Sequence, residues 1–147
     1  MFLFNVTMQN HGGYTYDGGE FPTVTISNLQ GHYKEAEQYL SLIKESDKAF
    51  EELVRYLKNY DEPTIVVMFG DHQPAVEQEF YEELYGKSLS KLSTEELQQR
   101  YKIPFVIWAN YDIESQDDLK TSPNYLSDLL LDTANVPKNE IETLHQR

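Results

Sequence analysis

Three short apolar runs, each rich in β-branched or aromatic residues, constrain the fold more than any other feature of the sequence. They cover residues 2–7, 64–69 and 104–109, and none of them alternates cleanly with polar residues. Continuous apolar runs of this length are typical of strands buried on both faces, as in parallel sheets. We therefore expect three core strands.

A long amphipathic helix is predicted between the first two runs. From residue 36 to residue 57, apolar side chains recur at helical spacing, with lysine and glutamate on the opposite face. A strand, a helix and a strand in that order indicate a right-handed crossover between two parallel strands, because a parallel connection needs a long return. Asp47 falls on the apolar face, where we expect it to make a structural hydrogen bond.

Shorter helices are expected after the second run. One covers residues 76–85, and a second follows Ser93, which forms a capping box with Glu96. A last helix has Ser122 as its N-cap and Pro123 at its first position. The fold class is therefore α/β, with a mainly parallel sheet flanked by helices, and the glycine-rich stretch 12–19 is an irregular loop.

Composition limits both the size and the partners of the chain. Its 147 residues make one domain, and three strands are too few for a doubly covered parallel sheet. We therefore expect residues 1–147 to be the C-terminal portion of a single domain truncated on its N-terminal side.

The net charge of −13 excludes nucleic-acid binding through a basic patch. The absence of cysteine excludes disulfides and thiolate chemistry, and no apolar run reaches the length of a membrane span.

Two polar loops follow the first and second predicted strands. Residues 8–14 read MQNHGGY, and residues 70–74 read GDHQP. In a parallel sheet, the loops at the carboxyl ends of the strands converge on the ligand site. We therefore expect His11 and the adjacent Asp71 and His72 to face a common crevice.

Asp71 and His72 are candidate metal ligands, because neighbouring side chains on a tight turn can both reach one cation. A carboxylate oxygen with an imidazole nitrogen fits manganese, magnesium or zinc. The alternative is that Asp71 caps the next helix and His72 is an ordinary surface imidazole. His11 has an alternative too, since an Asn-His-Gly-Gly sequence forms turns wherever it occurs.

Other polar residues give weaker signals. Trp108, Asn110 and Tyr111 end the third predicted strand and are candidates to line the crevice, although a tryptophan in a core strand is equally ordinary. His32 and His145 have no supporting neighbours in the sequence. We assign no function to either histidine.

Four motifs together resemble those of one enzyme family. Residues 4–14, 67–74, 104–111 and 122–126 are similar, in order and spacing, to the lipoteichoic acid synthase type of phosphoglycerol transferase. That family is a sulfatase-like branch of the alkaline phosphatase superfamily. The resemblance covers residues 2 to about 136.

The resemblance implies a membrane-anchored enzyme of the bacterial cell envelope, with its catalytic domain at the extracellular face of the membrane. Such an enzyme uses one divalent cation, commonly manganese, with magnesium and zinc as alternatives. A threonine nucleophile moves glycerol phosphate from phosphatidylglycerol to a glycan or polymer acceptor. No nucleic acid is implied as a partner, and residues 1–147 contribute no membrane segment.

Only part of the family's site carries over to this sequence. Asp71 and His72 match the paired metal ligands, and His11 matches the histidine that contacts the substrate phosphate, as a hydrogen-bond donor or as a general acid. The nucleophilic threonine and the remaining acidic ligand belong to the family's preceding half, so no threonine here inherits that role. We expect residues 1–147 to be inactive by themselves.

Two other functions remain open at this stage. A sulfatase or phosphatase of the same superfamily would share the fold and the Asp-His pair, and would differ in the upstream nucleophile, which is formylglycine in a sulfatase. A non-catalytic binding module could keep the fold without the chemistry. The Asn-His-Gly-Gly and Gly-Asp-His-Gln-Pro forms favour the transferase.

Overall fold

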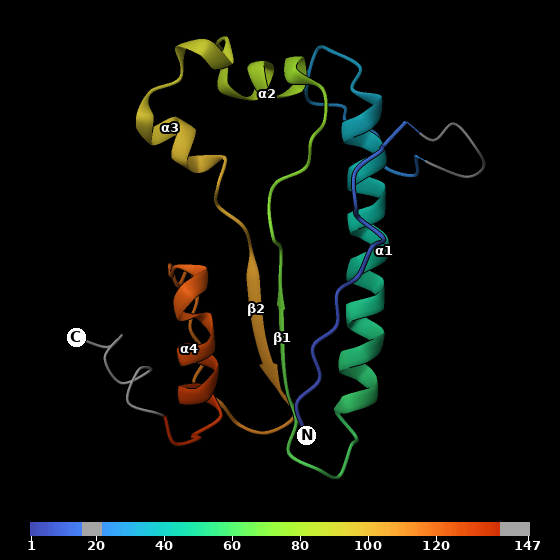
Figure 1. Ribbon diagram of the computed structural model, residues 1–147. Coiled ribbons are helices and arrows are strands. Elements are labelled where there is room, and N and C mark those ends of the chain that lie inside the picture. The colour runs from blue at the N-terminus through green and yellow to red at the C-terminus, as the bar shows by residue number, and fades with distance from the viewer. Residues whose placement is uncertain (16–21, 139–147) are drawn as a thin grey trace. The chain divides into compact units, whose positions relative to one another are not determined.

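The computed structural model describes residues 1–15 and 22–138, and Figure 1 shows its helices and strands. The chain divides into two compact units. The first comprises Met1–Val54 and Asp71–Ile103, and the second comprises Arg55–Gly70 and Pro104–Arg147. Each unit is described by itself below.

The long helix is confirmed as α1, Lys34–Leu57. Glu35 and Glu37 lie in its first turn and Arg55 in its last, as the helix dipole favours. The free backbone amides of the first turn are satisfied from another segment, because the Glu77 carboxylate accepts hydrogen bonds from the amides of Glu35 at 2.7 Å and Ala36 at 3.1 Å. A side chain just before the next helix thus caps α1.

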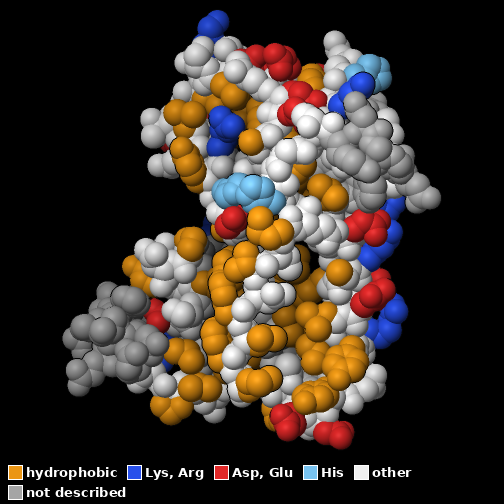
Figure 2. Space-filling model, turned by 45° about the vertical axis from the view of Figure 1, so that its right-hand side comes forward, with side chains coloured by type: hydrophobic (Ala, Val, Ile, Leu, Met, Phe, Trp, Pro, Cys, Tyr) orange, Lys and Arg blue, Asp and Glu red, His pale blue; other side chains and the backbone are white. Residues whose placement is uncertain are grey.

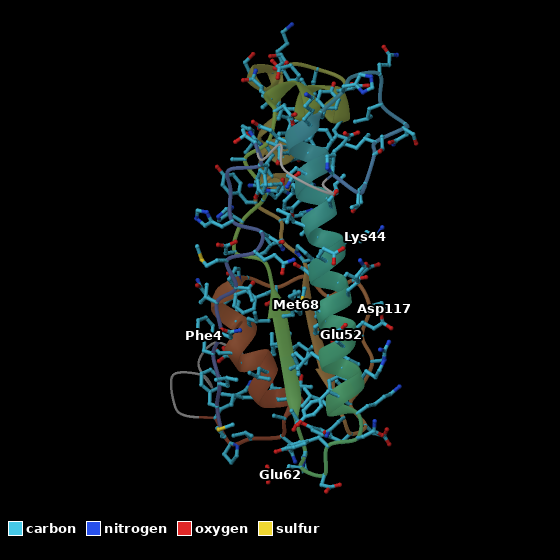
Figure 3. All side chains as sticks on the ribbon, turned by 90° about the vertical axis from the view of Figure 1, so that its right-hand side faces the viewer. Phe4, Lys44, Glu52, Glu62, Met68 and Asp117 are labelled. Carbon is cyan, nitrogen blue, oxygen red and sulfur yellow. The ribbon has the colours of Figure 1, made fainter. Side chains whose placement is uncertain are left out.

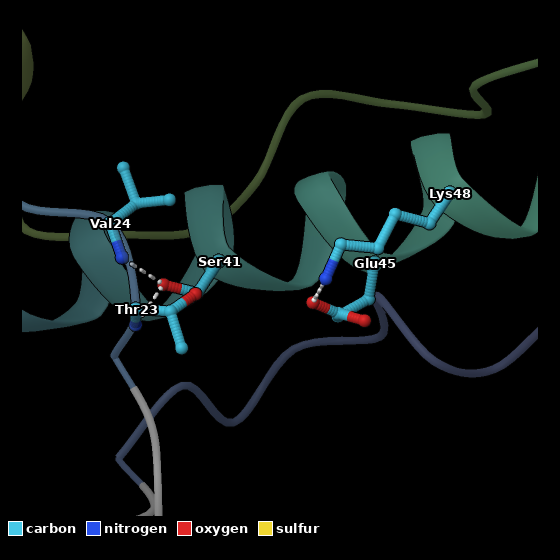
Figure 4. A network of polar contacts seen from close by, with 5 residues as sticks. All are labelled: Thr23, Val24, Ser41, Glu45 and Lys48. Atoms are coloured by element: carbon cyan, nitrogen blue, oxygen red, sulfur yellow. Dashed lines mark hydrogen bonds and ion pairs between the residues drawn. The ribbon is translucent and has the colours of Figure 1, made fainter.

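Ser41 attaches an extended segment to α1. Its hydroxyl is fully buried and accepts hydrogen bonds from the amides of Thr23 at 2.9 Å and Val24 at 3.0 Å (Figure 4). The same hydroxyl donates to the Glu37 carbonyl at 2.8 Å. Farther along the helix, Lys48 and Glu45 form an ion pair at 2.6 Å that is largely solvent-exposed.

The shorter helices follow the expected signals in most places. They are α2 (Gln78–Tyr85), the 3-10 turn η1 (Leu89–Lys91) and α3 (Thr94–Gln99). The capping box is confirmed, with Ser93 Oγ accepting from the Glu96 amide and Glu96 accepting from the Ser93 amide. The last helix, α4 (Leu126–Thr133), differs at its start, because the 3-10 turn η2 (Pro123–Tyr125) precedes it and the Ser122 side chain makes no cap hydrogen bond.

The first unit has an aromatic core. Tyr14, Tyr33 and Tyr81 are all buried. The Tyr14 ring meets Tyr39 of α1 edge-on at 5.5 Å between centroids, and Phe80 lies edge-on to both Tyr33 and Tyr81 at 5.4 and 5.6 Å. Such edge-to-face contacts add specificity to the burial of apolar area.

The second unit contains a two-stranded sheet. Strands β1 (Ile65–Phe69) and β2 (Phe105–Ala109) confirm two of the three predicted strands. They pair antiparallel, with Ile65 opposite Ala109 and Phe69 opposite Phe105 (Figure 1). The Gly70 amide donates to the Pro104 carbonyl at 3.1 Å, and the Asn110 amide donates to the Thr64 carbonyl at 3.1 Å, so both ends of the ladder are closed.

The parallel pair predicted for residues 2–7 and 64–69 is absent from the described residues, and the sheet found there is antiparallel. The segment after β1 leaves and returns at the same end of the ladder, so β2 runs back along β1. Residues 2–7 form no strand either, and no strand among residues 1–15 and 22–138 pairs with them. An apolar run becomes a strand only where a neighbour receives its backbone hydrogen bonds, and here Phe2 and Leu3 are each 80% exposed.

The expected burial of Asp47 is wrong, and the expected loop 12–19 is described only in part. Asp47 is exposed, contrary to the expected burial, because the buried face of α1 is built around Ala36 and Ser41, and Ile43, one turn before Asp47, is itself 38% exposed. The predicted glycine-rich loop 12–19 lies partly outside the described residues.

Figure 3 shows Lys44 and Glu52 projecting from α1, and Phe4 on the N-terminal segment. In the described part of the chain, no helix is both long and apolar enough to cross a membrane.

Candidate functional site

Asp71 and His72 directly follow Gly70 at the end of β1, and both side chains are open to solvent. Asp71 Oδ1 accepts a hydrogen bond from the His72 amide at 2.9 Å, which fixes the carboxylate and leaves Oδ2 available. His72 Nδ1 lies 2.8 Å from the Gln73 carbonyl. A proton on Nδ1 donates to that carbonyl, and Nε2 then carries a lone pair, which is the usual arrangement of a metal-binding histidine.

The two free atoms have the spacing of ligands to one cation. Asp71 Oδ2 and His72 Nε2 lie 3.5 Å apart. Two atoms that ligate one tetrahedral ion at about 2.1 Å are about 3.4 Å from each other. One carboxylate oxygen and one imidazole nitrogen fit manganese, zinc or magnesium, so the residues present suit the divalent cation expected from the sequence.

The loop that carries this pair is anchored on both sides. The Gln73 amide group donates to the carbonyls of Gln99 and Lys102, each at 3.1 Å. The Tyr81 hydroxyl donates to the Pro74 carbonyl at 2.6 Å. The residues after His72 are therefore fixed to α2 and to the end of α3.

His11 lies in a tight turn that is also anchored. Its amide donates to the Met8 carbonyl at 3.1 Å. The neighbouring Asn10 exchanges side-chain hydrogen bonds with Ser46 of α1 at 2.9 and 3.2 Å. The His11 imidazole is exposed and makes no hydrogen bond with another described residue, so it can contact a ligand.

Tyr14 anchors the His11 turn. Its hydroxyl donates to the Asn10 carbonyl at 2.7 Å, which fixes the residue before His11. Burial is the main cause that raises the pKa of Tyr14, and electrostatic interactions with Tyr81 and Asp71 raise the pKa further. A side chain of the buried aromatic core thus holds the His11 turn.

His11, Asp71 and His72 all belong to the first unit. Figure 2 shows histidine side chains gathered against an acidic side chain near the middle of the face in view. Within residues 1–15 and 22–138, however, no three histidine, aspartate or glutamate side chains come close enough together to hold a metal ion. His11 therefore forms no three-residue cluster with Asp71 and His72 in the described part of the chain.

Asn110 has a structural role instead of the expected place in the crevice. Its Nδ2 donates to the carbonyls of Leu57, Tyr60 and Glu62 at 3.0 to 3.2 Å, and its Oδ1 accepts from the Thr64 amide at 2.8 Å. These bonds engage both the amide nitrogen and the amide oxygen of Asn110 and fix the chain before β1. The other two candidates, Trp108 and Tyr111, belong to the same second unit.

The two remaining histidines were assigned no function from the sequence. His32 is exposed, and His145 lies outside the described residues. The anchoring residues Ser46, Tyr81 and Gln99 were not predicted from the sequence. Each occupies an unremarkable helical position, and only the folded chain shows its partner, which is the Asn10 side chain for Ser46, the Pro74 carbonyl for Tyr81 and the Gln73 side chain for the Gln99 carbonyl.

Comparisons with known proteins show which family the chain resembles. A sequence model of the family described as "Sulfatase" matches residues 1–136. A putative cyclic beta-1,2-glucan modification protein of Rhizobium meliloti (strain 1021) is 29% identical over 141 residues, which cover 90% of this chain and 22% of the relative. The chain thus spans about a fifth of the length of the curated relative that it matches. No solved structure matches it.

Proposed function

The chain belongs to the sulfatase family, whose fold is the α/β fold of alkaline phosphatase-like enzymes, and from this premise we propose that it is part of a metal-dependent phosphoglycerol transferase. The enzyme moves glycerol phosphate from a phosphatidylglycerol-type lipid to a cell-envelope acceptor at the extracellular face of the membrane. The relative is named for the modification of a cyclic glucan, which favours a glycan as the acceptor.

The observation that carries this proposal is the pair of free ligand atoms in the loop after β1. Asp71 Oδ2 and His72 Nε2 lie 3.5 Å apart, and each residue's other polar atom is held by the backbone. A divalent cation, manganese in the first place, would be held there together with ligands from outside this chain, since a catalytic metal site normally has three protein ligands. When bound, the cation activates a hydroxyl nucleophile and offsets charge on a phosphoryl group.

His11 supplies the second part of the site. Its exposed imidazole, on a turn fixed by Asn10 and Tyr14, is placed to donate a hydrogen bond to a phosphoryl oxygen or a proton to the leaving oxygen. Donation to an oxyanion stabilises the negative charge that develops during transfer. No threonine of this chain acts as the nucleophile, so residues 1–147 alone are inactive.

The competing candidate is a hydrolase of the same family. The description of the matching family, sulfatase, favours it directly. A hydrolase would use the same cation and the same histidine, and water would replace the glycan as the acceptor. Products distinguish the two reactions: a glycerol phosphate ester of the glucan from the transferase, and free sulfate or phosphate from the hydrolase.

The test uses the full-length protein with Mn²⁺, phosphatidylglycerol vesicles and a cyclic β-1,2-glucan. We expect glycerol phosphate to appear on the glucan, and Asp71→Asn or His72→Gln to lower the rate by about 1,000-fold or more, because each removes a ligand. His32→Gln is the matched control, since His32 is exposed and lies outside the site. Release of sulfate from aryl sulfates without glucan modification would contradict the transferase.

A further inference from the structure

Arg100 occupies an unusual position for an arginine in an acidic chain. It follows α3 as the C-cap residue, and its guanidinium carbon lies 4.6 Å from the centre of the Tyr81 ring. Tyr81 is buried, and Arg100 is half-buried. Stacking on an aromatic ring uses the face of a guanidinium and leaves the N–H donors at its edge available.

No carboxylate neutralises this arginine within residues 1–15 and 22–138. The chain has 25 acidic residues, yet in the described part Arg100 forms no ion pair. Lys87, a cation of the same region, shows the usual arrangement and pairs with Glu96 at 2.7 Å. The guanidinium of Arg100 is therefore held in place without being neutralised.

The residues around Arg100 are bonded to the candidate metal loop. Gln73, which follows His72, donates to the carbonyls of Gln99 and Lys102, the residues on either side of the Arg100–Tyr101 pair. Tyr81, beneath the guanidinium, donates to the Pro74 carbonyl. Two separate contacts thus place the Arg100 segment against the loop that carries Asp71 and His72.

The Arg100 guanidinium lies on a segment that is bonded to the loop of Asp71 and His72, so an anion bound at that loop can interact with the guanidinium as well as with a cation. Two like charges repel at short range, whereas a tetrahedral oxyanion attracts the cation and the guanidinium together. Arginine is also the side chain best suited to such an anion, because its planar fork donates two parallel hydrogen bonds to two oxygens.

We propose that Arg100 binds the tetrahedral oxyanion of the substrate and so determines its class, an inference that rests on the proposed function. The shared chemistry is a phosphate ester of a phosphoglycerol group or a sulfate ester. Arg100 is thus a specificity-determining residue that contacts the substrate and does not ligate the metal.

The test measures binding to the full-length protein by calorimetry, with Mn²⁺ present. The probes are sn-glycerol 1-phosphate, inorganic sulfate and Mn²⁺ alone. We expect Arg100→Gln to weaken binding of the anion that the wild type prefers by about 10- to 100-fold, and Arg100→Lys to weaken it less, because one charge remains without the fork. Mn²⁺ affinity stays within about threefold, and KM rises more than kcat falls.

Lys44→Gln is the matched control, because it removes one positive charge from an exposed position on α1 (Figure 3). It should leave anion affinity within about twofold. Anion affinity unchanged in Arg100→Gln would overturn the proposal. So would an equal loss of anion and Mn²⁺ affinity, which would show that Arg100 only supports the loop.

The two anions separate this inference from the proposed function. Tighter binding of glycerol phosphate, weakened by Arg100→Gln, supports both the inference and the transferase. Tighter binding of sulfate with the same dependence on Arg100 supports the oxyanion site and contradicts the transferase. Phosphoglycerol transfer with an unchanged KM in Arg100→Gln supports the transferase and overturns the inference.

Discussion

The carboxylate of Glu83 fixes the segment that precedes α1. It accepts hydrogen bonds from the amides of Gln30 at 2.5 Å and Gly31 at 3.1 Å, and a further one from the Tyr33 hydroxyl. Gly31 lies so close to the Tyr33 ring that a Cβ there would collide with it. The hydrogen bond to Glu83 is the main cause that raises the pKa of Tyr33 to about 12, and the same bond lowers the pKa of Glu83.

This raised pKa predicts an alkaline dependence of stability. The pKa of Tyr33 is about 10 in the unfolded chain and about 12 in the folded chain. The stabilisation that Tyr33 gives the folded chain is therefore complete below pH 10 and is lost as the pH rises towards 12. Tyr33→Phe should remove this part of the decline. Urea unfolding at pH 9, 10 and 11 measures it, with Tyr101→Phe, 83% exposed, as the control. An identical decline in Tyr33→Phe and the wild type would contradict the assignment.

Single side chains also explain the limits of the site prediction. Loop positions and residue types made Asp71, His72 and His11 candidates for the site, and the structure places all three in one unit. The sequence could not identify Tyr14 as the anchor of the His11 turn, because a hydroxyl that donates to a backbone carbonyl four residues earlier leaves no pattern in the sequence. The sequence could not single out Arg100 either, because its contact with Tyr81 is a tertiary contact that leaves no sequence pattern.

At the scale of elements, the most accurate predictions came from sequence patterns that involve residues close together in the chain. The Ser93–Glu96 capping box and the amphipathic pattern of α1 each depend on contacts along one helix, and both are present. The Ser122 cap failed, because a 3-10 turn separates Ser122 from α4. Local signals therefore establish that a helix exists more firmly than how it starts.

The attachment of residues 23–24 to α1 gives a prediction at this scale. Ser41→Ala removes the buried hydroxyl that accepts from two amides, leaving both without their partner, and should lower the free energy of unfolding by about 2 kcal/mol. Urea denaturation measures the loss, and hydrogen exchange should be faster at Thr23 and Val24. Lys48→Ala, which breaks only the exposed pair with Glu45, should cost about 0.5 kcal/mol or less. Equal losses in the two variants would contradict the role of Ser41.

At the scale of the whole molecule, strand pairing was the weakest part of the prediction. The apolar runs 64–69 and 104–109 became β1 and β2, but their antiparallel direction depends on where the intervening residues return, and periodicity does not encode that. The run 2–7 is also mainly apolar, yet it forms no strand. Strand composition is a property of a segment, whereas strand pairing is a property of the molecule around it.

The same dependence on the rest of the molecule leads to a prediction about the metal. Asp71 and His72 provide two ligands, and the described residues bring no third histidine, aspartate or glutamate to them. We therefore expect the 147-residue chain to bind Mn²⁺ at least about 100-fold more weakly than the full-length protein, because affinity depends on the number of charged ligands. Titration followed by electron paramagnetic resonance of free Mn²⁺ measures both affinities, with Asp71→Asn as the baseline in each. Equal affinity in the two forms would show that this chain completes the metal site by itself, and the division of ligands proposed for the transferase would then be wrong.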